Sequence, residues 1–103
     1  MFARVIRFED VTDAERAVGD DFFRKDFLPL AMATAGFDGA YLLVDEERGT
    51  SISITLWVSR EAMDATDGSA RHFLDQYAEV SGRQPTIETF EVAHAHLQAG
   101  TAR

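Results

Sequence analysis

Ser53, Thr55 and Trp57 alternate along one mainly apolar stretch of the chain. Alternate residues of a β-strand point to the same face of a sheet, so two hydroxyls and an indole would share one wall. Buried hydroxyls need hydrogen-bond partners, and a cavity that holds water or a polar ligand would supply them. The alternative is that Ser53 and Thr55 bond locally or lie near the sheet edge, while Trp57 is a core anchor.

Aromatic residues from two predicted helices could wall such a cavity. Phe23 and Phe27 lie one turn apart, and Tyr77 belongs to the apolar stripe of a later helix. A pocket between these rings and the strand would suit a flat aromatic ligand. We therefore predict a substrate-binding set that consists of Phe23, Phe27, Thr55 and Tyr77.

His72 is the candidate proton acceptor, because the unperturbed pKa of a histidine is about 6.5. Asp75 and Gln76 follow it at i+3 and i+4, and either could orient the ring. The alternative is a surface or helix-capping histidine at the border of the apolar stripe. The predicted catalytic set is Trp57 for packing, Ser53 for hydrogen bonding and His72 for proton transfer.

Metal and cofactor chemistry has little support in the sequence. There is no cysteine, which excludes disulfides, thiolate catalysis and Cys-based metal sites. His94 and His96 share one strand face and could together coordinate a metal ion, but they lack an evident third ligand. We expect no metal site and no cofactor.

Size and charge narrow the class of protein further. The chain has 103 residues, which suits one domain. Its net charge of −8 comes from 10 basic and 18 acidic residues, and such a field repels nucleic acid. No apolar run approaches the ~20 residues that span a bilayer, and no secretory signal is recognisable. We expect a cytoplasmic protein that binds neither nucleic acid nor membrane.

The order of predicted elements is strand, helix, strand, strand, helix, strand. Thr12 and Glu15 form a capping box at the start of the first helix, and Pro29 should end or kink that helix, with a short helical remainder up to residue 34. Ser59 caps a short helix that ends near residues 67–68. Strands are expected at 2–9, 39–45, 50–58 and 86–94, the long helices at 13–28 and 69–81, and the domain at 1–97 with a flexible tail at 98–103.

The first helix carries two apolar rows that one buried face does not need. Ala14, Val18 and Phe22 form the first row, and Phe23, Phe27 and then Leu30 and Ala31 form the second, rotated away from it. Either the helix is covered on two sides, or its second row lines a pocket or contacts a partner subunit.

This order of elements is that of an α+β, ferredoxin-like βαββαβ fold with an antiparallel sheet. Helices cover one face of such a sheet, yet most strands here carry apolar groups on both faces. An uncovered apolar face of that size would be an association surface. We therefore predict a homodimeric α+β barrel in which two copies pack sheet to sheet and bury Ile52, Ile54, Leu56 and Val58 at or near the junction.

Over about residues 1–94 the chain resembles the antibiotic-biosynthesis-monooxygenase family. The matching features are Gly36-Phe37-Asp38-Gly39 before the second strand, Trp57-x-Ser59-x-Glu61-Ala62 after the third, and His72-Phe73 in the last helix. The resemblance implies a dimeric α+β barrel. It places Trp57 at a tryptophan used by the polyketide oxygenases, Ser53 at their asparagine and Met63 at their tyrosine, with no clear counterpart of their later arginine.

The haem-degrading branch of the family matches less well, since Arg7, Thr66 and Asp75 stand where its asparagine, tryptophan and histidine would be. The resemblance implies a cofactor-independent monooxygenase that acts on a small aromatic or quinone-like substrate in a pocket between sheet and helices. The alternative is a non-catalytic dimer of the same fold that binds a small hydrophobic or aromatic molecule.

Overall fold

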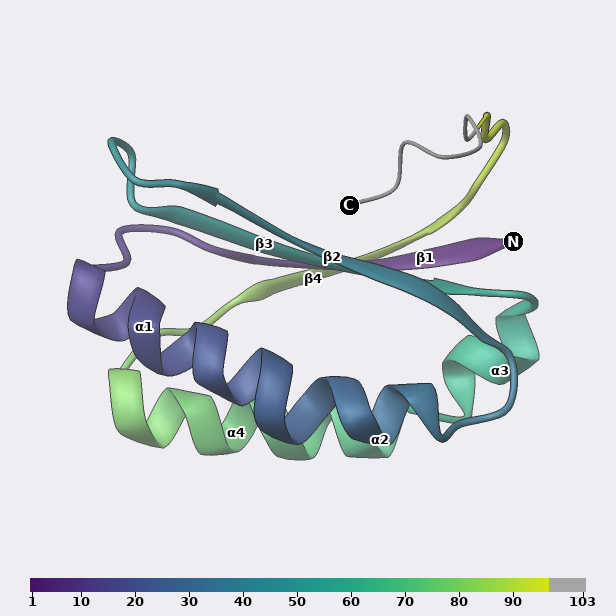
Figure 1. Ribbon diagram of the computed structural model, residues 1–103, viewed down its shortest axis with the longest axis horizontal. Helices are drawn as coiled ribbons and strands as arrows, with labels where there is room; N and C mark the ends of the chain where they lie inside the picture. The colour runs from purple at the N-terminus through teal and green to yellow at the C-terminus, as the bar shows by residue number, and fades with distance from the viewer. Residues whose placement is uncertain (97–103) are drawn as a thin grey trace.

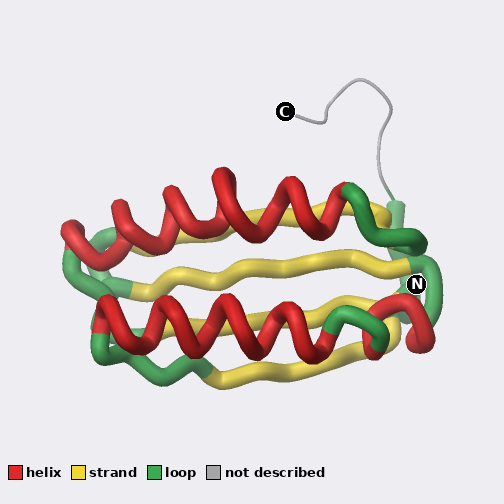
Figure 2. The backbone as a smooth tube through the Cα atoms, turned by 90° about the horizontal axis from the view of Figure 1, so that it is seen from below, coloured by secondary structure: helices red, strands yellow, loops and turns green. Residues whose placement is uncertain are grey.

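Among residues 1–96, four strands form one antiparallel sheet in the order β2-β3-β1-β4, and the helices lie on one side of it (Figures 1 and 2). The structure is a computed structural model that describes residues 1–96. The elements are β1 (Phe2–Phe8), α1 (Asp13–Asp21), η1 (Phe22–Phe27), α2 (Leu28–Met32), β2 (Phe37–Asp45), β3 (Thr50–Trp57), α3 (Arg60–Asp64), α4 (Asp67–Ser81) and β4 (Thr86–Glu91).

The predicted ferredoxin-like βαββαβ fold is confirmed. Several boundaries differ: β2 begins at Phe37, α4 begins at Asp67, and β4 ends at Glu91, short of the predicted residue 94. The predicted limit between the domain at 1–97 and the tail at 98–103 lies outside the described residues. Within residues 1–96, no helix is long and apolar enough to span a membrane.

The first helical segment differs in part from the sequence prediction. Thr12 and Glu15 form the predicted capping box, and the predicted short helical remainder past Pro29 is present as α2, which ends at Met32. The helix is continuous through Pro29 rather than ended there. A π-helical segment, η1, joins α1 to α2, and the Leu28 N–H bonds to the Phe23 carbonyl, five residues earlier. Pro29 then occupies the first turn of α2, where a residue without an N–H is tolerated. The wider π turn therefore absorbs the break that proline would otherwise impose.

A close contact joins the start of β2 to α3. Gly36 has a φ of +89°, and a Cβ at this position would lie 2.4 Å from the Cβ of Ala62. The Val58 N–H bonds to the Gly36 carbonyl at 2.9 Å, and the Ser59 hydroxyl accepts a hydrogen bond from the Ala62 N–H at 3.1 Å. The glycine thus allows the β3–α3 corner to pack directly on the chain entering β2.

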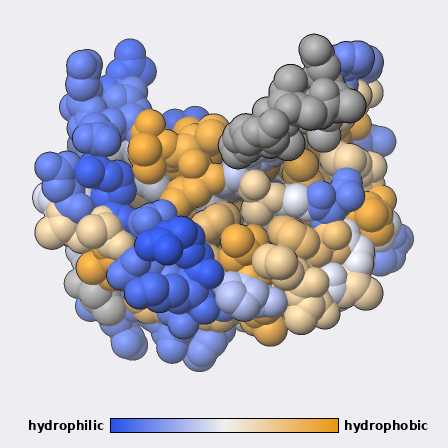
Figure 3. All heavy atoms as spheres, viewed as in Figure 1, coloured by the Kyte–Doolittle hydropathy of each residue, from blue (hydrophilic) through white to orange (hydrophobic). Residues whose placement is uncertain are grey.

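The helices cover one face of the sheet and leave the other face open. Ser53, Thr55 and Trp57 face the helices, while the isoleucine side of β3 faces away from them. On that open face, Tyr41 is 49%, Leu43 45% and Phe90 50% exposed. Figure 3 shows apolar residues gathered on the upper side of the sheet, beside the hydrophilic β2–β3 hairpin tip. An exposed apolar face is therefore present, and pairing of two copies through it stays a prediction.

The best-buried cluster lies beneath the β3–α3 corner. It consists of Ala31, Trp57 and Met63, and partly buried apolar residues pack around it. Arg4 on β1 is also buried, although its charge was not singled out from the sequence. Its guanidinium donates to the Thr66 hydroxyl at 3.0 Å and the Met63 carbonyl at 2.8 Å, and pairs with Asp67. The core at this end is therefore held by both packing and a buried arginine.

Candidate functional site

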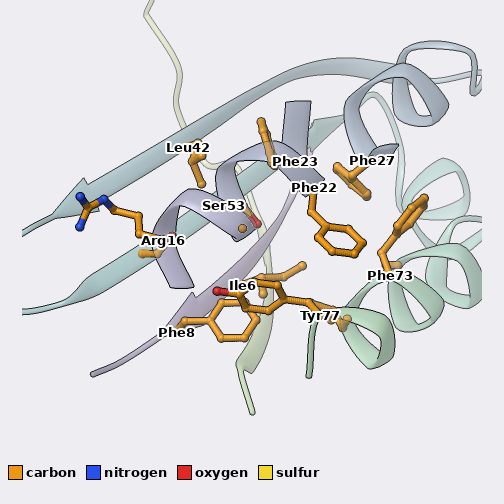
Figure 4. Close-up of a pocket in the computed structure, with 14 residues that line it drawn as sticks. Ile6, Phe8, Arg16, Phe22, Phe23, Phe27, Leu42, Ser53, Phe73 and Tyr77 are labelled. Carbon is orange, nitrogen blue, oxygen red and sulfur yellow. The ribbon is translucent and has the colours of Figure 1, made fainter. Parts of the chain in front are cut away.

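A cavity of about 90 Å³ lies between the helices and the helix-facing side of the sheet (Figure 4). Residues from β1, β2, β3, α1, η1 and α4 contribute to its wall. They are Ile6, Phe8, Arg16, Gly19, Phe22, Phe23, Phe27, Leu42, Ser51, Ser53, Ala70, Phe73, Leu74 and Tyr77.

The cavity has a closed side and an accessible side. On the β1–α4 side, Ile6 and Tyr77 are each 6% exposed. On the side of edge strand β2, Arg16, Phe23 and Leu42 are partly exposed. The cavity is therefore most deeply buried between Ile6 and Tyr77, although Phe8 and Phe73 on the same side are also partly exposed.

The π-helical segment supplies half of the aromatic residues of the wall. Phe22, Phe23 and Phe27 all line the cavity, so η1 brings residues from both predicted rows to one side. The Phe22 ring lies edge-on to the Tyr77 ring, with 6.2 Å between the ring centroids, and the Phe27 ring lies edge-on to the Phe73 ring, with 5.8 Å between the centroids. These are the favourable geometries for aromatic pairs. Of the alternatives left open by the sequence, the pocket-lining helix is the one observed.

Few polar groups reach this wall. The Tyr77 hydroxyl donates to the Glu15 carbonyl at 3.0 Å. A Cβ on Gly19 would lie only 3.1 Å from the Tyr77 hydroxyl oxygen. Arg16 donates to Asp13 at 2.8 Å and lies 3.8 Å from Glu46 of the β2–β3 turn. Figure 4 shows the Arg16 guanidinium directed away from the aromatic rings.

Ser51 and Ser53 complete the polar set on the sheet side of the cavity. Neither hydroxyl has a hydrogen-bond partner among the described residues, in contrast to Thr55. No buried polar side-chain atom in the described part of the chain lacks a partner. The serine hydroxyls must therefore be accessible, and Figure 4 shows the Ser53 hydroxyl within the cavity.

The two titratable side chains of the wall are poor bases at neutral pH. Burial, and secondarily the Glu15 charge, raises the pKa of the Tyr77 phenol. The hydrogen bond to Asp13 raises the pKa of Arg16. Since the ordinary values are already about 10 and above 12, Tyr77 stays a neutral hydrogen-bonding group and Arg16 stays charged.

The predicted site residues divide between the cavity and its surroundings. Ser53, Phe23, Phe27 and Tyr77 line the cavity as predicted. Thr55 and Trp57 are buried side by side outside it, where the Trp57 Nε1–H donates to the Thr55 hydroxyl at 3.0 Å. They match the alternative stated from the sequence, in which the threonine hydroxyl bonds locally and the tryptophan packs in the core.

His72 does not join the cavity wall. It is exposed on α4 and lies edge-on to the Phe73 ring at 6.0 Å. No hydrogen bond links it to Asp75 or Gln76 among the described contacts. This placement gives its predicted catalytic role no support, because an acceptor must lie within hydrogen-bond reach of the proton it removes.

Sequence reasoning missed several wall residues. Ser51 continues the alternation of Ser53 by one step and could have been included on that ground. Leu74 and Ala70 lie on the inward stripe of α4, but Arg16 carries no signal that distinguishes it from other surface arginines. His94 and His96 are exposed, and the described residues contain no group of three or more metal-ligating side chains.

The volume limits what this cavity holds. An engineered protein cavity of about 150 Å³ binds benzene, whereas this one measures about 90 Å³. A single ring therefore fits only with part of it at the accessible side or with small rotations of the surrounding rings. A fused-ring compound would require larger movements of η1.

Fold and cavity together define a ferredoxin-like α+β protein with an apolar site between its sheet and its helices. No family model matches the chain. The uncharacterized protein Rv2557 of Mycobacterium tuberculosis is 33% identical over 69 residues, which are 67% of this chain and 31% of that protein. The chain thus spans about a third of the length of the curated relatives it matches.

Solved structures match over nearly the whole chain. A protein of unknown function from Nitrosomonas europaea, NE2512, is 26% identical with a TM-score of 0.74, covering 96% of this chain and 95% of that one. The monooxygenase ActVA-Orf6 of Streptomyces coelicolor, in complex with nanaomycin D, is 14% identical with a TM-score of 0.76, covering 95% and 92%. SnoaB, a cofactor-independent oxygenase of Streptomyces nogalater, is 16% identical with a TM-score of 0.64, covering 91% and 94%.

These structures confirm the predicted resemblance to antibiotic biosynthesis monooxygenases, and what they show is a shared fold. At such low identity the activity and ligands of those proteins do not carry over to this chain.

Proposed function

We propose that this protein binds a small aromatic molecule in the cavity between η1, α4 and the sheet. The observation that carries the proposal is the composition of the wall: ring side chains on the helix side, and accessible hydroxyls in an otherwise apolar sheet surface. Ligand sites are typically apolar with a few oriented polar groups. The limited volume favours one ring over several.

A cavity-filling variant tests this proposal. Ser53→Leu adds an apolar side chain to the sheet wall of the cavity. Ser69→Leu, at an exposed position of α4, adds the same group away from the cavity. Single-ring aromatics such as phenol should raise the Tm of the wild type and of the Ser69 variant, because a ligand that binds the folded state stabilises it.

The Ser53→Leu variant should fold and show no such rise. An equal rise in all three proteins would place the ligand elsewhere and contradict the proposed site.

A second candidate is a cofactor-independent monooxygenase that acts on such a ligand. The specific observation in its favour is the fold shared with ActVA-Orf6 and SnoaB. An electron-rich, deprotonated ring could reduce dioxygen directly within an apolar pocket. Because the titratable wall residues have raised pKa values, we expect turnover only with compounds that ionise readily by themselves.

Oxygen uptake separates the two candidates. With a readily ionised single-ring hydroquinone, consumption above the protein-free rate should depend on Ser53 if the reaction occurs in this cavity. The role predicted for His72 is tested in the same assay with His72→Ala, which we expect to retain the wild-type rate. Ligand binding without oxygen uptake would leave the first candidate alone.

We also propose that two copies pair through the open sheet face. Tyr41, Leu43 and Phe90 lie exposed on that face, and large exposed apolar patches mark association surfaces. Leu43→Lys should convert a dimer to a monomer in sedimentation equilibrium, whereas Met32→Lys, at an exposed position of α2, should not. A wild-type monomer at micromolar concentration would refute this pairing.

A further inference from the structure

A second cavity, on the outer side of α4, is larger than the aromatic one and has a partly charged lining. This groove measures about 570 Å³ and lies between α4 and edge strand β4, over Arg4 of β1. Ligand sites commonly measure about 300–1,000 Å³. Thr89 and Ile87 are level with Arg4 and Ile6 on the neighbouring strand, so they lie on the helix-facing side of the sheet. The groove is therefore of ligand size, and the proposed pairing of open sheet faces does not cover it.

Two arginines line this groove, and they differ in their surroundings. Arg4 is 2% exposed and pairs with Asp67, which also lines the groove. Arg71 lies on the next turn of α4 and is exposed, and within residues 1–96 its guanidinium takes part in no ion pair. The two guanidiniums and the one carboxylate leave a single uncompensated positive charge in the groove.

Hydrogen-bond donors are also available on the sheet side of the groove. The Nε–H of Arg4 has no partner among the described residues, and no buried side-chain nitrogen or oxygen in that part of the chain lacks one. This N–H therefore faces open space rather than a closed interior. The Thr89 hydroxyl is exposed and level with Arg4, and it makes no side-chain hydrogen bond among the described contacts. An anion in the groove thus has candidate donors on Arg4, Arg71 and Thr89.

The rest of the lining is mainly apolar. Ala70 and Leu74 lie one turn apart on α4, and Ile87 of β4 is 36% exposed. Apolar surface beside a charge favours a ligand that has both a charged end and a hydrocarbon part. Ala70 and Leu74 also line the aromatic cavity, so the two sites share part of one wall.

We propose that this α4–β4 groove binds a small organic anion with one carboxylate and a short hydrocarbon chain. The Arg71 guanidinium holds the carboxylate, with the Thr89 hydroxyl and the Arg4 Nε–H as further donors, and the chain lies along Leu74 and Ile87. Hydrogen bonds from arginine to a carboxylate are among the strong ones in proteins, and one negative charge matches the one uncompensated positive charge. The site is independent of the aromatic cavity, so failure of either proposal leaves the other standing.

Chemical-shift titration of the isotope-labelled protein tests the proposal, at constant ionic strength because salt screens exposed charges. The probes are hexanoate, 1-hexanol, which has the chain without the charge, and acetate, which has the charge with almost none of the chain. Hexanoate should shift the amide signals of Gly68, Arg71 and Thr89, and should bind more tightly than either other probe. Equal affinities for hexanoate and 1-hexanol would show that no charge is recognised and would overturn the proposal.

Matched variants assign the charge to one side chain. Arg71→Gln should weaken hexanoate about 5- to 15-fold, between the values for an exposed ion pair and for a hydrogen bond to a charged group. Its affinity for 1-hexanol should stay unchanged, which shows that the groove still forms. Arg71→Lys keeps the charge and should retain most of the hexanoate affinity. Arg48→Gln, in the exposed β2–β3 turn, removes the same charge elsewhere and should have no effect.

Two further results would contradict the site. One is wild-type affinity for hexanoate in Arg71→Gln, or an equal loss in Arg48→Gln, because binding would then depend on no charge or on net charge alone. The other is loss of the hexanoate shifts in Ser53→Leu, because the ligand would then occupy the aromatic cavity.

Discussion

Replacing Gly36 by alanine should destabilise the protein more than an ordinary substitution at a positive-φ glycine. Gly36 has a φ of +89°, and its new Cβ would lie 2.4 Å from the Cβ of Ala62. Real Cβ atoms do not approach that closely, so either β2 or α3 must shift. Gly82 is the natural comparison, because its φ of +73° is similar but nothing lies within 4 Å of its Cβ position.

The magnitude follows from two separate costs. A left-handed backbone costs a non-glycine residue about 1–2 kcal/mol, and this applies to both positions. Overpacking in a dense region adds about 1–3 kcal/mol, and this applies to Gly36 alone. We therefore expect a loss of about 2–5 kcal/mol for Gly36→Ala and about 1–2 kcal/mol for Gly82→Ala.

Urea denaturation of the two variants, of Ala62→Gly and of the double variant Gly36→Ala/Ala62→Gly measures these costs. Removing the Ala62 methyl should relieve the clash, although glycine in α3 itself costs about 1 kcal/mol. The coupling energy between the two sites should be about 1–3 kcal/mol. A coupling near zero, or equal losses for Gly36→Ala and Gly82→Ala, would refute the close contact.

Three further substitutions probe the interior and its edge. Arg4→Lys loses the forked pairing with Thr66 and the Met63 carbonyl, and should lower the free energy of unfolding by about 1–3 kcal/mol in urea titration; an unchanged midpoint would contradict it. Tyr77→Phe loses the hydrogen bond to the Glu15 carbonyl and should lower the free energy of unfolding by about 0.5–1.5 kcal/mol in the same titration. An unchanged free energy of unfolding would contradict that hydrogen bond. The hydrogen bond from the Thr12 N–H, aided by Arg83, lowers the pKa of Glu15. A lowered folded-state pKa stabilises above the ordinary glutamate value and is lost as pH falls, so the Tm gap between wild type and Glu15→Gln should be widest near pH 7 and close below about pH 4; a gap that grows in acid would contradict this sign.

The fold could be predicted because local signals agreed with one another. The capping box at Thr12, the turn glycine Gly49 and the stop at Gly82 each marked a boundary that the structure shows. The π segment could not be predicted. Proline at position 29 indicates a break when regular α-helical bonding is assumed, and only a change to i→i+5 bonding before it keeps the helix continuous.

The candidate site was only partly predictable for a different reason. Strand alternation places Ser53, Thr55 and Trp57 on the correct face, but it does not show where along that face the helices leave a cavity. The last two lie where Met63 and Ala31 fill the space. His72 precedes the inward-facing Phe73 by one residue, and one step of about 100° around a helix is enough to turn it to solvent.

The account depends on a small aromatic molecule entering the cavity under η1. Intermolecular nuclear Overhauser effects between p-xylene and the isotope-labelled protein measure this directly. We predict contacts from the ligand methyl groups to the ring protons of Phe23, Phe27 and Tyr77. Contacts confined to Tyr41 and Phe90 on the open sheet face, or no contacts at saturating ligand, would contradict it.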